Sequence, residues 1–156
     1  WGVVRGFAVS EYGGGRSHGG GNAGGCRILI VGDDETIRAL LTDVLARRGH
    51  RTQCASSCAG AIVSMETLPP DLVLLDLKLL DGPGWMLYEE MQSRPRLRSI
   101  PVVILTGDIE AVPQGALPES PLIGFLEKPF SVRALKEAID ERVANSRILA
   151  ARSESV

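Results

Sequence analysis

Several polar residues that could take part in chemistry stand directly after apolar runs of this sequence. One acid closes the run 72–75, two acids follow the run 28–31 after a single glycine, and a threonine follows 102–105. A lysine stands two positions after the run 122–126. Short apolar runs of this kind predict buried strands, and parallel strands carry their sites at the carboxyl ends. We therefore expect one cluster built from Asp33, Asp34, Asp76, Thr106 and Lys128.

The chemistry of such a cluster follows from its charges. Two carboxylates about 4 Å apart repel by roughly 4 kcal/mol at an effective dielectric constant near 20, so a cation must offset the three acids. Mg²⁺ is the usual divalent ion where phosphoryl groups are handled by few protein ligands, and Lys128 adds a fixed positive charge. A carboxylate placed like Asp76 can attack phosphorus and form an acyl phosphate. The hydroxyl of Thr106 could then bind one phosphoryl oxygen.

The elements that must position these residues alternate between strand and helix. Strands are expected at 28–31, 51–55, 72–75, 102–105 and 122–126, and helices at about 37–48, 57–67, 85–92 and from 132 onward. This alternation predicts an α/β fold with a doubly wound parallel sheet and helices on both faces. The segment 108–121 holds three prolines and Gly115, so we expect an irregular fourth helix of one or two turns at most.

The composition is that of a globular protein, with 44% hydrophobic and 23% charged residues and a net charge of −2. Nothing in it suggests direct nucleic-acid binding or membrane insertion, and the N-terminus lacks the apolar core of a signal peptide. A cytoplasmic location is therefore expected. Cys26, Cys54 and Cys58 are interpreted as reduced thiols, and His18 and His50 as exposed residues.

Residues 1–25 form a flexible Gly-rich tail or linker by composition, residues 26–145 the folded domain, and residues 146–156 a C-terminal tail. This last segment is too short for a DNA-binding or enzymatic output module. Signalling by contact with another protein is the expectation that follows.

Six stretches together resemble the receiver domain of two-component response regulators. They are residues 28–35, 37–41, 71–79, 84–85, 101–107 and 125–130, in the family's order and with its separations. The resemblance implies a flavodoxin-like five-stranded sheet of order 2-1-3-4-5. It also implies a histidine kinase or phosphotransfer protein as donor, a downstream protein partner and no enzyme activity beyond phosphotransfer and its reversal. Residues 4–8 faintly resemble a segment of sensor histidine kinases, which favours a hybrid-kinase origin over a stand-alone regulator.

The resemblance also assigns roles to individual residues. Asp76 looks like the phosphoacceptor, and Thr106 and Lys128 look like the groups that contact the phosphoryl. Thr106 and Phe125 resemble the switch pair, in which the aromatic ring turns inward when the threonine moves. The remaining roles are a cis peptide bond before Pro129 and a Mg²⁺ site formed by Asp33, Asp34, Asp76 and the backbone carbonyl of Lys78.

The sequence departs from the family at Gly32, where the first of two adjacent acids is usual. Its loss should weaken Mg²⁺ binding unless Asp34 compensates or the register shifts by one. Leu80, where Pro is common, is a lesser departure that alters loop stiffness. A degenerate receiver that binds proteins without being phosphorylated is the alternative. An Asp-dependent phosphohydrolase is disfavoured, because Lys78 stands where those enzymes place a general acid.

Overall fold

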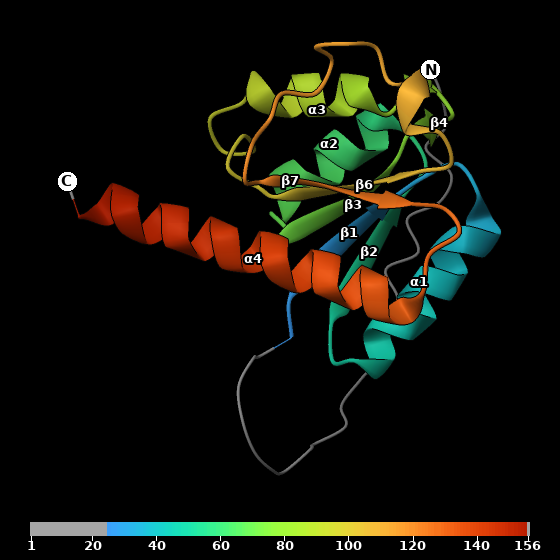
Figure 1. The fold of residues 1–156 in the computed structure, drawn as a ribbon, viewed down its shortest axis with the longest axis horizontal. Helices are drawn as coiled ribbons and strands as arrows, with labels where there is room; N and C mark the ends of the chain where they lie inside the picture. Colours follow the sequence, from blue (N-terminus) through green and yellow to red (C-terminus); the bar gives the residue numbers. More distant parts are fainter. Residues whose placement is uncertain (1–24, 156) are drawn as a thin grey trace.

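Five strands pair in parallel and form the central sheet of the computed structural model, which describes residues 25–155 (Figure 1). They are β1 (Arg27–Val31), β2 (Arg51–Ala55), β3 (Leu72–Asp76), β6 (Val102–Thr106) and β7 (Ile123–Glu127). Their order across the sheet is β2-β1-β3-β6-β7, which confirms the predicted order 2-1-3-4-5. The flexible linker expected at the N-terminus lies outside the described residues, apart from Gly25.

Four α-helices connect or follow these strands: α1 (Glu35–Arg47), α2 (Cys58–Thr67), α3 (Trp85–Gln92) and α4 (Val132–Glu154). Short polar side chains begin three of them. Ser57 accepts a hydrogen bond from the N–H of Gly60, and Ser131 accepts one from Ala134. Asp34 does the same at the start of α1. Each cap satisfies N–H groups that have no partner within the helix.

The helices cover both faces of the sheet, α1 and α4 on one face and α2 and α3 on the other (Figure 1). Alternate residues of each strand serve the two faces. Ile28 and Ile30 pack toward α1 and α4, whereas Leu29 and Val31 pack toward α2 and α3. A strand buried on both sides must be apolar throughout, which explains the continuous apolar runs in the sequence.

The crossover from β6 to β7 contains a 3₁₀ turn, η1 (Ile109–Ala111), and no α-helix. The prediction of an irregular fourth helix is therefore confirmed. Its physical cause is the series of prolines after the turn, which cannot donate the hydrogen bonds of a helix interior. Ile109 and Phe125 are both close to half exposed beside this thin crossover.

Two features differ from the expectation. The last helix continues to Glu154, so residues 146–154, expected to be a tail, are helical. No glycine or proline follows Val143 to stop the helix, and Arg, Leu and Ala favour its continuation. The loop after Asp76 contains a small antiparallel hairpin, β4 (Lys78–Leu79) and β5 (Gly82–Pro83), which the sequence did not reveal.

None of the helices within residues 25–155 combines the length and the apolar character needed to cross a membrane.

Candidate functional site

Three loops meet at the carboxyl end of the sheet, where the sequence placed the site. The N–H of Asp33, after β1, donates to the carbonyl of Lys78, after β3, at 3.1 Å. The N–H of Lys128, after β7, donates to the carbonyl of Thr106, at the end of β6, at 2.7 Å. These backbone bonds fix the separations between the loops before any side chain is considered.

Asp76 is the centre of this edge and is only 7% exposed. Its Oδ1 accepts a hydrogen bond from the N–H of Lys78 at 3.0 Å. Its Oδ2 accepts one from the Nζ of Lys128 at 2.5 Å. A carboxylate this buried needs such partners, because an unpaired charge would lose its hydration without compensation. The structure thus brings together the acid and the lysine that lie 52 positions apart in the sequence.

The two acids after β1 have different surroundings. Asp33 is exposed, and its backbone N–H is bound to the Lys78 carbonyl beside Asp76. Asp34 turns toward α1, where its Oδ1 accepts from the N–H groups of Thr36 and Ile37 at 2.9 and 3.2 Å. Asp34 was expected to join the metal ligands, and in the structure its carboxylate is the N-cap of α1. Negative charge is favourable at that end of a helix, which gives this position a structural reason.

Gly32 lies directly beside Asp76. A Cβ built on Gly32 would come within 3.1 Å of the Asp76 Cβ and 3.8 Å of its Oδ2. A side chain at position 32 would therefore reach the site, which supports the register in which Gly32 replaces the first acid. The carbonyl of Gly32 accepts a 2.6 Å hydrogen bond from Nη1 of Arg38. Sequence reasoning missed Arg38. The available signal was its position in the first turns of α1, one helical turn after Asp34.

The residues expected to form the switch lie on the neighbouring strands β6 and β7. Thr106 is 5% exposed and follows Leu105, which pairs with Asp76 across the sheet. Its Oγ1 accepts the N–H of Asp108 at 3.1 Å. Phe125 pairs with Ile104 in the strand register and is 43% exposed. The ring is thus on the outside of β7 beside the irregular crossover.

The edge strand β7 is anchored from α4. Nη1 of Arg142 donates to the carbonyls of Pro121 and Ile123 at 2.9 and 2.8 Å. The Arg142 side chain crosses Gly124, where a Cβ would come within 3.2 Å of it. The Lys128–Pro129 peptide bond that follows β7 is cis, the isomer that the resemblance implied.

The oxygen atoms at this edge fit a hard cation with few protein ligands. The carboxylates of Asp33 and Asp76 and the carbonyl of Lys78 lie on loops joined by the bonds described above. Among residues 25–155 no three His, Cys, Asp or Glu side chains form a group able to hold a metal. Any metal held here would therefore keep several water or phosphate ligands, which is the ordinary behaviour of Mg²⁺ and not of a structural zinc site.

The family model described as "Response regulator receiver domain" matches residues 28–140. Protein Rrf1 of Nitratidesulfovibrio vulgaris is 29% identical over 120 residues, which cover 76% of this chain and 83% of Rrf1. The transcriptional regulatory protein GltR of Pseudomonas aeruginosa is 32% identical over 73% of this chain and 47% of its own length. The chain therefore spans about half the length of GltR, and 27% and 23% of two other curated relatives.

Solved structures agree with these relatives. The signal receiver domain of a signal transduction histidine kinase from Syntrophus aciditrophicus superposes with a TM-score of 0.67 and 25% identity, over 76% of this chain and 90% of that one. The receiver domain of the sensor histidine kinase PA1611 from P. aeruginosa shares the fold at a TM-score of 0.69 and 22% identity, over 77% and 98% of the two chains. The latter structure has a magnesium ion coordinated in its active-site cleft.

Proposed function

The chain belongs to the response regulator receiver domain family of two-component systems, and from this premise we propose that Asp76 accepts a phosphoryl group from a phosphohistidine. The single observation that carries the proposal is the Asp76–Lys128 pair: a buried carboxylate at a strand end, with a lysine on one of its two oxygens. An acid that only capped a turn would not require a second loop to supply a cation.

In the proposed step an oxygen of Asp76 attacks phosphorus opposite the histidine nitrogen of the donor protein. The new O–P bond forms as the P–N bond breaks, and the bonding pair returns to the imidazole, which leaves neutral after taking up a proton from solvent. Lys128 offsets the negative charge on the phosphoryl oxygens. The N–H of Lys78 keeps the other carboxylate oxygen in place, so the attacking oxygen is held in one orientation.

Receiver domains bind Mg²⁺ in the active site, and we propose that here Asp33, Asp76 and the Lys78 carbonyl hold it. When bound, the ion supplies positive charge to the phosphoryl oxygens. The set of donor groups is small, because Asp34 is engaged at the helix start and Gly32 provides no side chain. Loose binding by two carboxylates is consistent with an ion that completes its shell with water and phosphate.

Thr106 and Phe125 are the proposed switch. The Thr106 hydroxyl now accepts the Asp108 N–H, and a phosphoryl group on Asp76 would give its own proton a strong acceptor. Movement of Thr106 away from β7 would open space for the ring of Phe125, which is now partly exposed. The phosphoryl group would then shift the population between two arrangements of this face.

Receiver domains are signalling modules and not classical enzymes. We propose that this one receives its phosphoryl group from a histidine kinase or phosphotransfer protein and passes the signal to a downstream protein. All three cysteines of the chain are free thiols, which fits the reducing conditions of the cytoplasm.

Intact-mass measurement after incubation with a small phosphodonor, with and without Mg²⁺, tests the proposal. The expected result is one phosphoryl adduct that requires Mg²⁺ and is absent from Asp76→Asn. Lys128→Met should form the adduct much more slowly while keeping the fold. An adduct that persists in Asp76→Asn would place the phosphoacceptor elsewhere.

Gly32 favours a second candidate function, a receiver that binds its partners without being phosphorylated. That function predicts no adduct in a folded sample saturated with Mg²⁺. It also predicts that Asp76→Asn leaves partner binding unchanged.

A further inference from the structure

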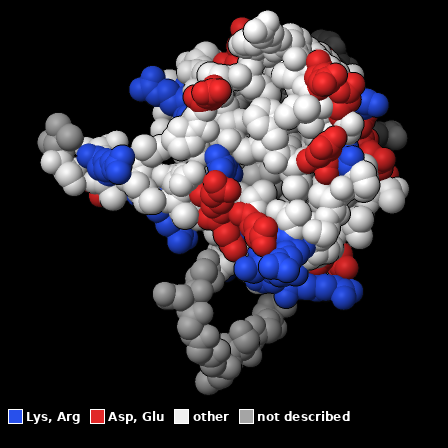
Figure 2. All heavy atoms as spheres, viewed as in Figure 1, with Lys and Arg blue, Asp and Glu red and all other residues white. Residues whose placement is uncertain are grey.

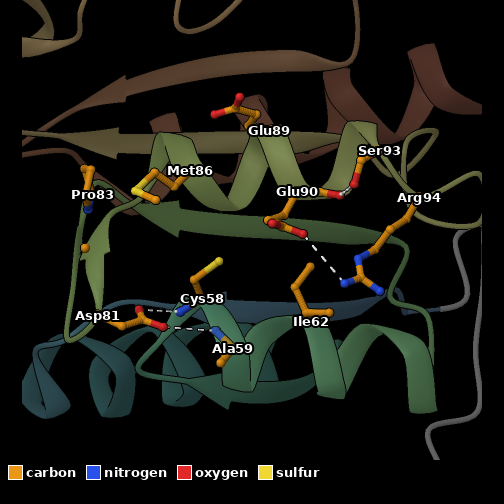
Figure 3. A pocket seen from close by; sticks show the side chains of 11 residues that line it. Cys58, Ala59, Ile62, Asp81, Pro83, Met86, Glu89, Glu90, Ser93 and Arg94 are labelled. Carbon is orange, nitrogen blue, oxygen red and sulfur yellow. Dashed lines mark hydrogen bonds and ion pairs between the residues drawn. The ribbon is translucent and has the colours of Figure 1, made fainter.

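A groove of about 710 Å³ runs between α2 and α3, on the face of the sheet opposite α1 and α4 (Figure 3). Its apolar floor is formed by Cys58 and Ile62 of α2, by Pro83 of β5 and by Met86 of α3. Cys58 and Ile62 project from α2 into the space below α3. Met86 is 48% exposed and presents a large apolar side chain at the surface of this groove.

The rim of this groove is acidic. Asp81 closes one end, where its carboxylate accepts the N–H groups of Cys58 and Ala59 at 2.7 and 3.1 Å. Burial alone would raise the pKa of Asp81, but these backbone hydrogen bonds outweigh it and hold the pKa below its ordinary value, so Asp81 stays ionised. Glu89 stands on the outer edge and takes part in none of the ion pairs among residues 25–155.

The other end of the rim is already neutralised. Arg94 lies within 3.4 Å of Glu66 and 3.6 Å of Glu90, and Arg96 lies 3.8 Å from Glu66, so two positive charges offset two negative ones. Among residues 25–155, the acidic side chains of this groove without an ion-pair partner are therefore Asp81 and Glu89, and they favour an occupant that carries positive charge beside an apolar side chain.

The far end of α4 has these properties. The last buried residue of the helix is Val143, and the helix continues for about another three turns past the body (Figure 1). This segment, residues 146–154, carries basic side chains on its surface (Figure 2). Ile148 is 51% exposed, Arg147 precedes it, and Arg152 follows one turn later on the same side. A nine-residue helical segment is ~13 Å long at 1.5 Å per residue, similar to α2 and α3.

We propose that two copies of this chain associate by docking the end of α4 of one copy, residues 146–154, into the α2–α3 groove of the other. Ile148 would cover Met86 and the apolar floor, Arg152 would face Glu89, and Arg147 would face Asp81. This is the helix-in-groove mode of recognition. If both copies exchange helices, the interface closes as a two-fold dimer. The inference is independent of phosphorylation and goes beyond the proposed function.

Sedimentation of the full 156-residue chain over a range of concentrations tests the proposal. The expected result is a concentration-dependent dimer. Ile148→Glu should weaken dimerisation at least tenfold. Glu89→Lys and Arg152→Glu should each weaken it, and the double variant should restore it, because the charge pair is re-formed in reverse. Leu40→Glu is the matched control, since Leu40 is an exposed apolar residue of α1 outside both surfaces.

Three outcomes would overturn the proposal. One is a chain that stays monomeric at every concentration. Another is a dimer that Ile148→Glu weakens but Glu89→Lys does not, which would mean that α4 pairs with α4. The third is a double variant as weak as the single ones. Thermal unfolding of each variant separates loss of association from loss of the fold, and all of these positions are on the surface.

Discussion

Gly32 determines how much negative charge surrounds Asp76. It leaves Asp33 as the one carboxylate beside Asp76 on the loop after β1, because Asp34 is engaged at the start of α1. A carboxylate at position 32 would lie close enough to Asp76 to share a cation with it. We expect Gly32→Asp to lower the dissociation constant for Mg²⁺ about tenfold relative to Gly32→Asn, about 1.4 kcal/mol.

Gly32→Asn is the necessary control, because both side chains meet the 3.1 Å contact with the Asp76 Cβ and differ only in charge. Titration calorimetry with Mg²⁺ provides the comparison, together with the melting temperature of each variant. Equal affinities in the two variants would show that the charge at position 32 has no part in the metal site.

His50 is a second residue whose surroundings carry a measurable consequence. The sequence suggested an exposed histidine, but it is half-buried and its Nδ1 accepts the N–H of Cys26 at 3.1 Å. That bond requires neutral His50. Burial holds the pKa of His50 below its ordinary value of 6.5, Asp140 opposes this effect and Arg48 adds to it. Protons are therefore taken up on unfolding at acidic pH.

The sign of the effect follows. The stabilisation by neutral His50 is fully present above pH 6.5 and is lost as the pH falls below that value toward the pKa of the folded state. Wild-type melting temperature should therefore decline more steeply than that of His50→Ala between pH 7 and pH 5. Parallel melting curves across this range would contradict the assignment.

At the scale of elements, the start of α1 is where two roles of Asp34, helix cap and metal ligand, can be tested separately. The sequence did not distinguish them. Asp34→Ala should lower the free energy of unfolding by about 1 kcal/mol, because the N–H groups of Thr36 and Ile37 lose their acceptor. Asp34→Ser should recover most of this stability, since a hydroxyl also caps a helix. Urea denaturation measures both.

The same variants report on the metal. Mg²⁺ affinity should be nearly unchanged in Asp34→Ser and strongly reduced in Asp33→Ser. A comparable loss of Mg²⁺ affinity in both variants would show that Asp34 is also a metal ligand.

Most elements were predictable because the residues that favour each local structure are also the ones that suit its packing in the fold. The run 72–75 is apolar on both faces of a covered sheet, and Ser57 and Ser131 precede helices that they cap. The hairpin β4–β5 was not predictable, since two-residue strands leave no alternation to detect. The cap role of Asp34 could not be told apart from a metal-ligand role, because a metal site and a helix start favour the same residue type at this position.

At the scale of the whole molecule, the sheet edge that carries Asp76 and the α2–α3 groove are joined by the hairpin of β4 and β5. At its beginning the N–H of Lys78 binds Asp76 and its carbonyl binds the loop of Asp33. At its tip Asp81 binds the first N–H groups of α2. In between, the N–H of Leu80 donates to the carbonyl of Ser56 at 3.1 Å. The hairpin is thus attached at its first residue, Lys78, and at its turn, Leu80 and Asp81.

We expect this connection to couple Mg²⁺ binding at Asp76 to dimerisation through the α2–α3 groove. If Mg²⁺ at Asp76 changes the dimerisation constant by some factor, dimerisation must change the affinity for Mg²⁺ by the same factor, because binding free energies around a closed cycle sum to zero. Calorimetric Mg²⁺ titrations of wild type at dimeric concentrations and of Ile148→Glu should differ by the factor that sedimentation gives with and without Mg²⁺. Through six residues of backbone, a neighbouring molecule would then influence how firmly this one keeps its ion.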